Sequence, residues 1–451
     1  TYSKTDTSLK KTYGGVTIPK VEFNEVTLSE ALQALGAMSK NASAGKVIPN
    51  FIVKNPDMGK KMLTLSLANI PMTDVIDYLA RMGYTQLWLN PVLANNQPEV
   101  TYHGYAITDF YQVDPRFGTN ESFRQLVATT HVRETLQDTH AAADDRRLFS
   151  DGWFVATMPD MNQRNPHLAT YLIQNSLWWV EYAGLSGIRV DTYSYIDRAF
   201  LTEWSRRVTQ EYPNLNIVGE EWSSNPSTVA YWQRGRNPPD GYVSYLPSLF
   251  DFALQEAVAM GLKEAEGWGT GLRRIYKVLA QDSVFPDPYN LVVFHDNHDM
   301  SRMFTALGER QDLNRMALTF LLTTRGIPQI LYGTEVLMSN KGTEDHGIIR
   351  SDFPGGWPGD TENAFTGQGL SDDERAMQDF TRKLLQWRRT APALREGKLT
   401  HYVPMDGVYV YFRHDAAQKI MVVLNNGDAA RTLDTRRFHE MIGTAATGMD
   451  V

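Results

Sequence analysis

The chain has 451 residues, of which 42% are hydrophobic and 21% charged, and its formal net charge is −8 at pH 7. This length allows two or three domains with sizeable cores, and the composition is that of an ordinary globular protein. No basic stripe is present, so the sequence indicates no nucleic-acid partner. The chain contains no cysteine, which excludes disulfides, thiolate metal sites and a cysteine nucleophile. No apolar run reaches the roughly 18 residues that a membrane-spanning helix needs.

Residues 1–80 are predicted to form a small α+β module. Apolar residues at 21, 23 and 26 indicate a strand, and Thr27 is placed to cap a helix that follows it. Apolar residues at 51 and 53 and then at 63, 65 and 67 indicate two further strands before a helix that begins near Thr73, so the predicted order is strand, helix, strand, strand, helix. The runs VEFNEVTLSEALQAL and LTLSLANIPMTDVIDYL resemble the short N-terminal domain of secretins and TonB-dependent receptors. A generic α+β module is the alternative.

Residues 81–394 alternate short apolar strands with amphipathic helices, which is typical of a parallel α/β fold. Helical spacing of apolar residues predicts helices around 168–182 and 380–387. No glycine-rich fingerprint follows the first strand, so a (β/α)₈ TIM barrel is predicted rather than a dinucleotide-binding sheet. The predicted strand-and-loop units are 84–92, 187–195, 216–222, 242–252, 290–299 and 326–337.

Residues 395–451 change to an all-β pattern. The stretches 408–415 and 419–428 are predicted to be two strands joined by a polar turn. They begin a small β-sandwich-like domain at the C-terminus. No obvious closing strands follow them, so this domain is expected to be incomplete.

Three acidic residues stand where predicted strands end. Asp191 follows the run GIRV, Glu220 follows IVG, and Asp299 closes FHDNHD. In a parallel barrel the functional residues lie at the carboxyl ends of the strands. A carboxylate at an apolar strand end is costly to bury unless it is paired or used. A structural ion pair is the alternative for each acid alone, but three such acids in one barrel favour a shared site.

The motifs GIRVD, GEEW and HDNHD resemble, in order and at plausible intervals, the strand-end motifs of the α-amylase superfamily. The runs MPDMN (158–162) and HGYAITDFYQVDPRFGT (103–119) resemble the neopullulanase and cyclomaltodextrinase branch. The resemblance covers roughly residues 83–451. It implies a TIM-barrel enzyme that hydrolyses α-1,4-glucosidic bonds in cyclodextrins, pullulan, maltooligosaccharides or starch with retention.

The resemblance also implies a role for each motif residue. Asp191 matches the nucleophile, Glu220 the general acid/base, and Asp299 the third carboxylate, which stabilises the transition state. No cofactor is implied for the chemistry. The positions that match substrate-binding residues are Tyr105, Arg189, Trp222 and His298.

Glycoside cleavage explains why two carboxyls with different pKa values are needed. One must be protonated to protonate the leaving oxygen, and another must be ionised to attack the anomeric carbon. Arg189, two residues before Asp191, is expected to lower the pKa of that acid, and a dry setting near Trp222 is expected to raise that of Glu220. Strand alternation places Glu220 and Trp222 on one face and Glu221 on the other.

One family motif is absent where it is expected. The third barrel strand, ending in Asp and closing with Asn-His, and the domain B that follows it have no counterpart, because 131–153 is polar, short and helical in pattern. Two explanations compete: either the sequence omits residues, or the chain is a degenerate homologue that binds α-glucan without cleaving it. A third hypothesis is an envelope-associated interaction module led by residues 1–80.

The remaining expectations concern metals, partners and location. No His-x-x-x-His spacing lies on a clear helix, so no catalytic metal is expected; the resemblance allows a structural calcium ion. The expected partner is an α-glucan, and the branch allows a homodimer. The resemblance of residues 1–80 favours a periplasmic or cell-envelope location, with the cytoplasm as the alternative.

Overall fold

The computed structural model describes residues 21–27, 62–67, 81–83, 132–152, 160–357, 359–444 and 447–450. The predicted strand 84–92 and the segment 103–119, which contains Tyr105, lie outside the described residues. The same is true of the helices predicted after Thr27 and Thr73 and of the strand predicted at residues 51 and 53.

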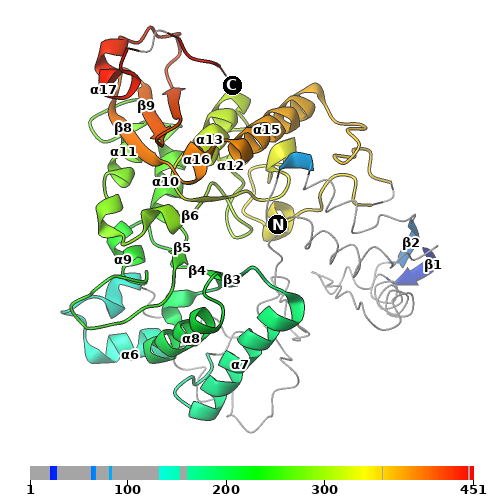
Figure 1. Ribbon diagram of the computed structural model, residues 1–451. Coiled ribbons are helices and arrows are strands. Elements are labelled where there is room, and N and C mark those ends of the chain that lie inside the picture. The colour runs from blue at the N-terminus through cyan, green and yellow to red at the C-terminus, as the bar shows by residue number, and fades with distance from the viewer. Residues whose placement is uncertain are drawn as a thin grey trace.

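Five parallel strands lie side by side at the centre of the molecule (Figure 1). They form two sheets, β3–β4–β5 and β6–β7, joined by a parallel bridge between Phe250 and Val292. The amide of Asp251 donates to the carbonyl of Val292 at 2.9 Å across this junction. The parallel α/β prediction is therefore confirmed for this part of the chain. The strands are β3 (Gly187–Val190), β4 (Asn216–Gly219), β5 (Ser248–Leu249), β6 (Val292–Phe294) and β7 (Ile327–Gln329).

Helices connect and cover these strands, as the alternating sequence pattern requires. The bounds of the longer helices are α7 (Pro166–Ala183), α8 (Arg198–Glu211), α10 (Phe252–Gly261), α11 (Arg273–Leu279), α13 (Gln311–Thr323) and α15 (Asp372–Thr390). Short helices are α9 (Pro226–Ala230), α12 (Met303–Ala306), α14 (His346–Ile349) and α16 (Pro392–Arg395). Single 3₁₀ turns are η3 (Tyr193–Tyr195), η4 (Asp282–Val284), η5 (Pro288–Asn290) and η6 (Thr334–Val336). The helices predicted around 168–182 and 380–387 are confirmed as α7 and α15.

Local sequence explains where the two predicted helices begin and end. The side chain of Asn165 accepts from His167 N at 3.0 Å, Pro166 occupies the first turn, and Gly184 ends α7 in a left-handed conformation. In α15, Ser371 and Glu374 form a capping box. Acidic residues fill the first turn of α15 and arginines the last, which matches the helix dipole.

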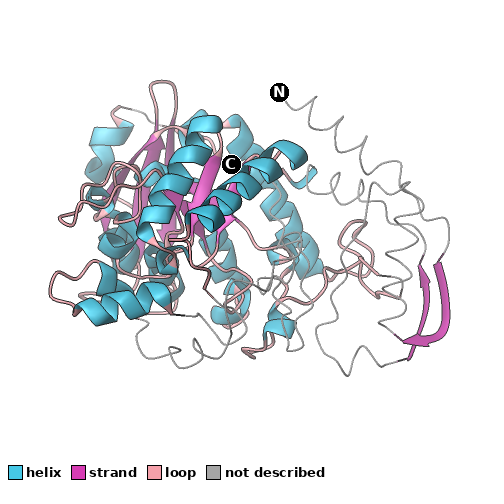
Figure 2. Ribbon diagram, turned by 90° about the horizontal axis from the view of Figure 1, so that it is seen from below, coloured by secondary structure: helices cyan, strands magenta, loops and turns pink. Residues whose placement is uncertain are grey.

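The C-terminal strands form an antiparallel sheet in the order β10–β9–β8. Figure 2 shows the described strands in magenta among the cyan helices. The strands are β8 (Lys398–Met405), β9 (Val408–His414) and β10 (Lys419–Asn425). Burial alternates residue by residue along β10, whereas nearly all of the central strand β9 is buried. The two strands predicted at 408–415 and 419–428 are confirmed as β9 and β10, whereas β8 was not predicted. A 3₁₀ turn η7 (Thr435–Phe438) and a short helix α17 (His439–Ile442) follow the sheet.

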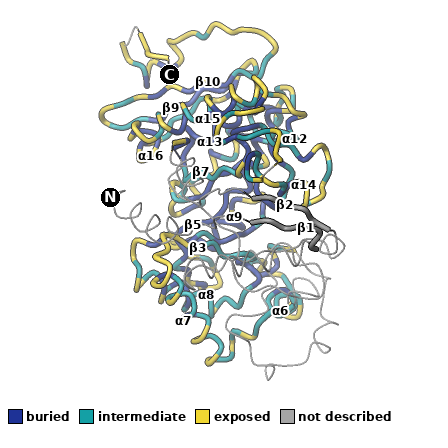
Figure 3. The backbone as a smooth tube through the Cα atoms, turned by 90° about the vertical axis from the view of Figure 1, so that its right-hand side faces the viewer, coloured by how far each residue is buried: buried dark blue, intermediate teal, exposed yellow. Residues whose placement is uncertain are grey.

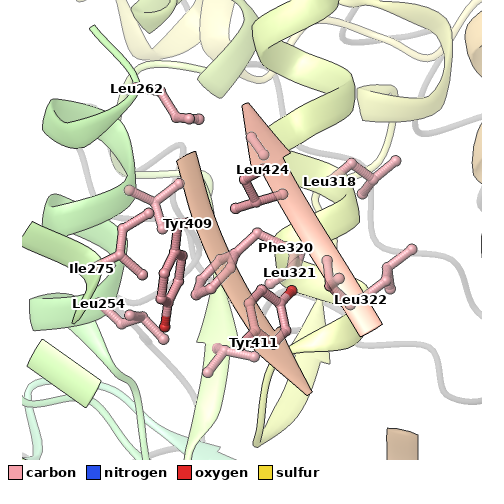
Figure 4. Packing of buried hydrophobic residues seen from close by; sticks show 14 of the residues in the cluster. Leu254, Leu262, Ile275, Leu318, Phe320, Leu321, Leu322, Tyr409, Tyr411 and Leu424 are labelled. Atoms are coloured by element: carbon pink, nitrogen blue, oxygen red, sulfur yellow. The ribbon is translucent and has the colours of Figure 1, made fainter. Parts of the chain in front are cut away.

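One hydrophobic core joins the barrel helices to this C-terminal sheet. Its buried members come from α10, α11, α13, α15, β9 and β10. Figure 4 shows Leu254 and Ile275 next to Tyr409, and the rings of Phe320 and Tyr411 meet edge to face with centroids 5.8 Å apart. Figure 3 shows buried residues along the backbone of β5 and α13. The barrel helices and the sheet are therefore packed as one body.

Near the N-terminus, β1 (Val21–Thr27) and β2 (Met62–Leu67) pair antiparallel, with Val21 opposite Leu67. Both strands fall where apolar alternation predicted them. The register shifts between Phe23 and Val26, which marks a bulge. Thr27, predicted as a helix cap, is the last residue of β1.

The segment predicted to replace the third barrel strand is helical. It holds a 3₁₀ turn η2 (Arg133–Leu136) and a helix α6 (Ala143–Asp151). Within 132–152 there is no strand, and among the described strands β3 pairs only with β4. The described part of the barrel therefore begins at β3.

Arg325, two residues before β7, connects three parts of the barrel. Its side chain is 1% exposed and contacts Asp251 Oδ2 at 2.7 Å and Asp282 Oδ1 at 2.6 Å. Asp251 also caps α10 by accepting from Leu254 N at 3.0 Å. A buried cation between two acids cannot be removed without leaving uncompensated charge.

Replacing Arg325 with leucine is expected to lower the free energy of unfolding by about 3–5 kcal/mol, because two carboxylates then lose their buried partner. Urea unfolding followed by circular dichroism measures the change. Arg310→Leu is the matched control, since Arg310 pairs with Asp312 at side-chain exposures of 61% and 63%, and its loss should cost at most about 0.5 kcal/mol. An equal loss of unfolding free energy in the two variants would contradict the stabilising role of the buried contacts of Arg325 with Asp251 and Asp282.

Candidate active site

Arg189 links two of the three predicted acids. It lies on β3, and Asp191 follows that strand on the same face because side chains alternate. Its Nη1 contacts Asp191 Oδ1, and its Nη2 lies 2.7 Å from Glu220 Oε1. The side chain of Arg189 is only 6% exposed. A single guanidinium group therefore holds both carboxylates at the ends of neighbouring strands.

Glu220 is positioned by the pairing of β3 with β4. Its backbone amide donates to Val190 O at 2.9 Å, and its Oε2 accepts from Thr192 N at 3.2 Å. Thr192 has a φ of +46°, a conformation that threonine seldom adopts. This turn aims the Thr192 amide at the Glu220 carboxyl, so backbone strain accompanies the contact.

The pKa of Glu220 is raised to about 7, chiefly by burial. The charge of Arg189 lowers it, while the charges of Asp191 and Asp299 raise it. Interaction with both acids places all three carboxyls around one site. The predicted rise in the pKa of Glu220 is confirmed, and a carboxyl with such a pKa can hold a proton near neutral pH.

Asp299 is held by residues from two different loops. His298 Nε2 lies 3.1 Å from its Oδ2, and Arg350 Nη2 lies 2.5 Å from its Oδ1. The side chain of Asn297 accepts from the Asp299 amide at 2.8 Å. Burial lowers the pKa of His298 to about 4, so its imidazole is neutral at pH 7 and can donate one hydrogen bond.

Arg350 is a site residue that the sequence did not reveal. It directly follows α14, more than 50 residues after Asp299, and no strand-end motif marks it. Besides its contact with Asp299, its Nε donates to His298 O at 2.7 Å. Its Nη2 also lies 3.0 Å from His346 Nδ1. Only the folded chain brings this arginine to the carboxylates.

The three acids differ in exposure. The side chain of Glu220 is 8% exposed, whereas those of Asp191 and Asp299 are 22% and 25% exposed. Desolvation favours the protonated form of the buried Glu220 carboxyl. The site thus combines one buried carboxyl with two more open ones.

Glu221 points away from this site, as strand alternation predicted. Its side chain is fully buried, and Arg133 Nη1 lies 3.4 Å from its Oε1. Burial raises the pKa of Glu221. Trp222 stacks on Phe252, with ring centroids 4.7 Å apart and planes at 22°. Its described contacts are with apolar residues, and its predicted contact with substrate stays a prediction.

The helical segment 132–152 packs against the loops that follow β3 and β4. Besides the contact of Arg133 with Glu221, the rings of Phe149 and Tyr195 stack with centroids 4.7 Å apart. Gln137 Nε2 donates to Thr228 O at 3.0 Å. This segment therefore supports the backbone next to Asp191 and Glu220 from the side opposite the carboxyls.

Other predicted features are described only in part. Of the MPDMN run, residues 160–162 are described, and burial raises the pKa of Asp160 to about 6. Within the described ranges no three His, Asp or Glu side chains gather as metal ligands, and the structural calcium ion that the resemblance allowed stays a prediction. No helix in the same ranges is both long and apolar enough to cross a membrane.

Comparison with protein families accounts for most of the chain. The α-amylase catalytic domain matches residues 71–136 and 142–419, and the cyclomaltodextrinase C-terminal domain matches residues 399–451. The chain belongs to the α-amylase family. The five parallel strands are accordingly part of the TIM barrel of that family, and β8–β10 lie within or beside its C-terminal β domain.

Relatives and solved structures agree with this α-amylase membership. The chain is 24% identical to a cyclomaltodextrin glucanotransferase of Klebsiella oxytoca over 428 residues, covering 78% of this chain and 64% of the relative. It is 27% identical to neopullulanase 2 of Thermoactinomyces vulgaris over 398 residues. This alignment covers 80% of this chain and 62% of the relative. An α-amylase from Geobacillus thermoleovorans, solved with acarbose, superposes on this chain with a TM-score of 0.59 at 28% identity. The superposition covers 79% of this chain and 80% of the α-amylase.

The chain spans less than two thirds of the length of these two curated relatives. The α-amylase match is interrupted at 137–141, inside the segment where the third-strand motif was expected. The alignment with the transferase is also 428 positions long, although it covers only 78% of the 451 residues of this chain. Relatives thus carry residues that have no counterpart here.

Replacing Glu220 with glutamine is expected to stabilise the protein increasingly as pH rises from 4.5 to 7. The folded-state pKa of Glu220, about 7, exceeds the ordinary 4.5, so its stabilising protonation is complete below pH 4.5 and is lost as pH approaches and passes 7. The stability difference between variant and parent should grow by roughly 1–3 kcal/mol.

Urea unfolding of both proteins at pH 4.5 and pH 7.5 measures this difference. Glu203→Gln is the control, because pairing with Arg206 lowers the pKa of Glu203 and gives the opposite sign. A stability difference for Glu220→Gln that does not change with pH would show that the pKa is not raised.

Proposed function

We propose that the chain is a retaining glycoside hydrolase that cleaves α-1,4-glucosidic bonds. The observation that carries the proposal is the bridge from Arg189 to Asp191 and Glu220, with Asp299 close enough to influence the same carboxyl. The strand-end motifs place these acids at positions that match the catalytic acids of the α-amylase family. A buried acid near two ionised carboxylates is the arrangement that glycoside cleavage requires.

In this proposal, Asp191 attacks the anomeric carbon while the bond to the leaving oxygen breaks. Glu220 donates its proton to that oxygen, which leaves a glycosyl ester on Asp191 and an ionised Glu220. Water then attacks the same carbon, Glu220 takes the proton of the water, and Asp191 is released as a carboxylate. Retention follows because the carbon is inverted twice.

Arg189 serves both steps. Its contact with Asp191 positions the nucleophile, and its 2.7 Å contact with Glu220 favours the carboxylate that must form after proton donation. Asp299 and His298 are placed to hold sugar hydroxyls near the reacting carbon, since one accepts hydrogen bonds and the other can donate one. Tyr105 is proposed to stack beneath the sugar on the basis of its motif.

The proposed substrates are cyclodextrins, pullulan, maltooligosaccharides and starch. The names of the relatives, cyclomaltodextrin glucanotransferase, neopullulanase and cyclomaltodextrinase, support this range. Transfer of the glycosyl group to a sugar instead of water is chemically the same second step with a different acceptor. A homodimer and a periplasmic or envelope location stay predictions.

The second candidate is an α-glucan-binding protein without activity. It is favoured by the break in the family match at 137–141. The contacts of Arg189 with Asp191 and Glu220 favour an enzyme instead. A protein that only binds glucan does not need a carboxyl with a pKa near 7 beside two other carboxyls.

Replacing Asp191 with asparagine should lower the release of reducing ends by about 1,000-fold or more, because the nucleophile is lost. Binding of maltotriose should change by less than about 3-fold, since the variant keeps the shape of the site. Reducing-sugar assays on β-cyclodextrin, pullulan and starch, with isothermal calorimetry for binding, measure both effects.

Asp434→Asn is the matched control, because Asp434 is a surface acid paired with Arg436. Activity of Asp191→Asn equal to that of the control would refute the assigned nucleophile. A parent protein that binds maltotriose but releases no reducing ends from any of the three substrates would favour the non-catalytic candidate.

Arg350 is a positioning residue, and Arg350→Leu is expected to lower kcat by about 100-fold while KM changes less, because a displaced Asp299 stabilises the transition state poorly. Arg350→Lys should recover only part of the activity, since lysine cannot bond Asp299 and His298 together. Steady-state kinetics on maltotriose separate the two constants. A change confined to KM would contradict the positioning role.

A further inference from the structure

Two buried arginines cross between the loop that carries Asp299 and the end of α14. Arg302 lies between Asp299 and α12, and Arg350 directly follows α14. Arg350 Nε donates to His298 O at 2.7 Å, and Arg302 Nε donates to Ile349 O at 3.0 Å. The two short helices lie close together in Figure 3. Each arginine therefore holds the backbone just before a charged residue of the opposite loop.

The guanidinium group of Arg302 is enclosed by the loops that follow β6 and β7. Arg302 is only 1% exposed, and its Nη1 donates to Tyr332 O at 2.8 Å. Its guanidinium carbon lies 5.1 Å from the centroid of the Tyr332 ring, which adds a cation–π contact. Burying a cation at this depth is costly unless its donors are bonded. Because Nε and Nη1 bond backbone carbonyls, Arg302 fixes the position of the main chain in the opposite loop.

The peptide group on the other side of Arg350 is held as well. Tyr332 OH donates to Ser351 O at 2.8 Å. The carbonyls of Ile349 and Ser351, one on each side of Arg350, are thus bonded to Arg302 and Tyr332, which also contact each other. This closed set of contacts limits the directions in which the side chain of Arg350 can leave the backbone.

Asn340 anchors the backbone of Arg302 itself. Asn340 is fully buried, and its Oδ1 accepts from Arg302 N and from Ser301 Oγ, each at 3.1 Å. Its Nδ2 donates to Thr343 O at 2.6 Å, in the loop that leads to α14. Arg302 is therefore joined to this loop through its backbone as well as through its side chain.

A purely structural role is the alternative for Arg302. Burial raises the pKa of Asp296, while its hydrogen bond from Met303 N and the charge of Arg302 lower it. Loss of Arg302 would then weaken folding without a particular effect on catalysis. The contacts of Arg302 beside Arg350 favour a role at the site, because Arg350 is the residue that bonds Asp299 from the opposite loop.

We propose that Arg302 is a positioning residue that fixes the backbone of Arg350, which in turn holds Asp299 where the transition state forms. The inference rests on the function proposed above. Arg302 is buried, so it acts through Arg350 rather than on the sugar. Its substitution should therefore lower kcat more than it raises KM, and its effect should vanish once Arg350 has been removed.

The test is a double-mutant cycle on Arg302→Leu and Arg350→Leu, with kinetics on maltotriose and urea unfolding of every protein in the cycle. Arg302→Leu should lower kcat by about 30-fold, because a small displacement of a positioned group has a large effect, while KM changes by less than about 3-fold. The double variant should lose about 100-fold in kcat, as Arg350→Leu does alone, rather than the roughly 3,000-fold expected of independent effects.

Two conservative changes decide the matter if Arg302→Leu does not fold. Tyr332→Phe removes only the hydrogen bond to Ser351 O and should lower kcat by about 3-fold. Arg302→Lys keeps the charge but can bond only one of the two carbonyls, so its kcat should lie between those of the parent and Arg350→Leu. A kcat equal to that of the parent in both variants would overturn the proposal.

Arg413→Leu is the matched control, because Arg413 is also fully buried and also bonds backbone carbonyls. It donates to Thr323 O at 3.2 Å and to Gly397 O at 2.9 Å. Its guanidinium carbon lies 5.9 Å from the centroid of the Tyr289 ring. These contacts lie where the barrel meets the C-terminal sheet, so Arg413→Leu should destabilise the protein and leave kcat unchanged. An equal loss of kcat in Arg302→Leu and Arg413→Leu would refute the positioning role.

The kinetic and unfolding cycles separate this inference from the proposed function. In an active parent, losses of kcat that multiply in the double variant would overturn the role of Arg302 and leave the hydrolase intact. A parent without activity would refute the hydrolase, and the unfolding cycle would then decide. A double variant that loses less unfolding free energy than the sum of the single variants would support the positioning of Arg350 by Arg302, and additive losses would overturn it.

Discussion

Two carboxylates that are needed in different protonation states must lie close together without driving each other apart, and Arg189 meets this constraint. One nitrogen of its guanidinium contacts Asp191 and the other lies 2.7 Å from Glu220. Because β3 and β4 pair in parallel with Val190 opposite Gly219, both acids emerge at the same edge of the sheet. Without the cation, burial and repulsion would protonate or displace one of them.

The rigidity of that edge comes from packing elsewhere in the molecule. The barrel helices and the C-terminal sheet share one core, and Arg325, two residues before β7, contacts Asp251 after β5. Close packing transmits position over distance because interiors deform little. In the same junction Glu266, on the loop that joins α10 to α11, accepts from the amide of Gly407. The C-terminal sheet thus supports the barrel helices.

The segment 132–152 shows how a shortened chain can still support the site. Relatives carry residues that have no counterpart here, and the family match breaks at 137–141. Residues 132–152 form two short helical pieces, and Arg133 among them contacts the buried Glu221. This helical segment therefore supports the run GEEW through the contact of Arg133 with Glu221.

The sequence alone determined the order of strands and helices, the acids at three strand ends and the face on which Glu220 lies, because alternation and helical period are local properties of the chain. It could not give the contact of Arg350 with Asp299 or the pKa of Glu220 near 7. Those depend on burial and on residues brought together from distant loops. Electrostatic interactions act through space, so only the tertiary structure decided which charges meet.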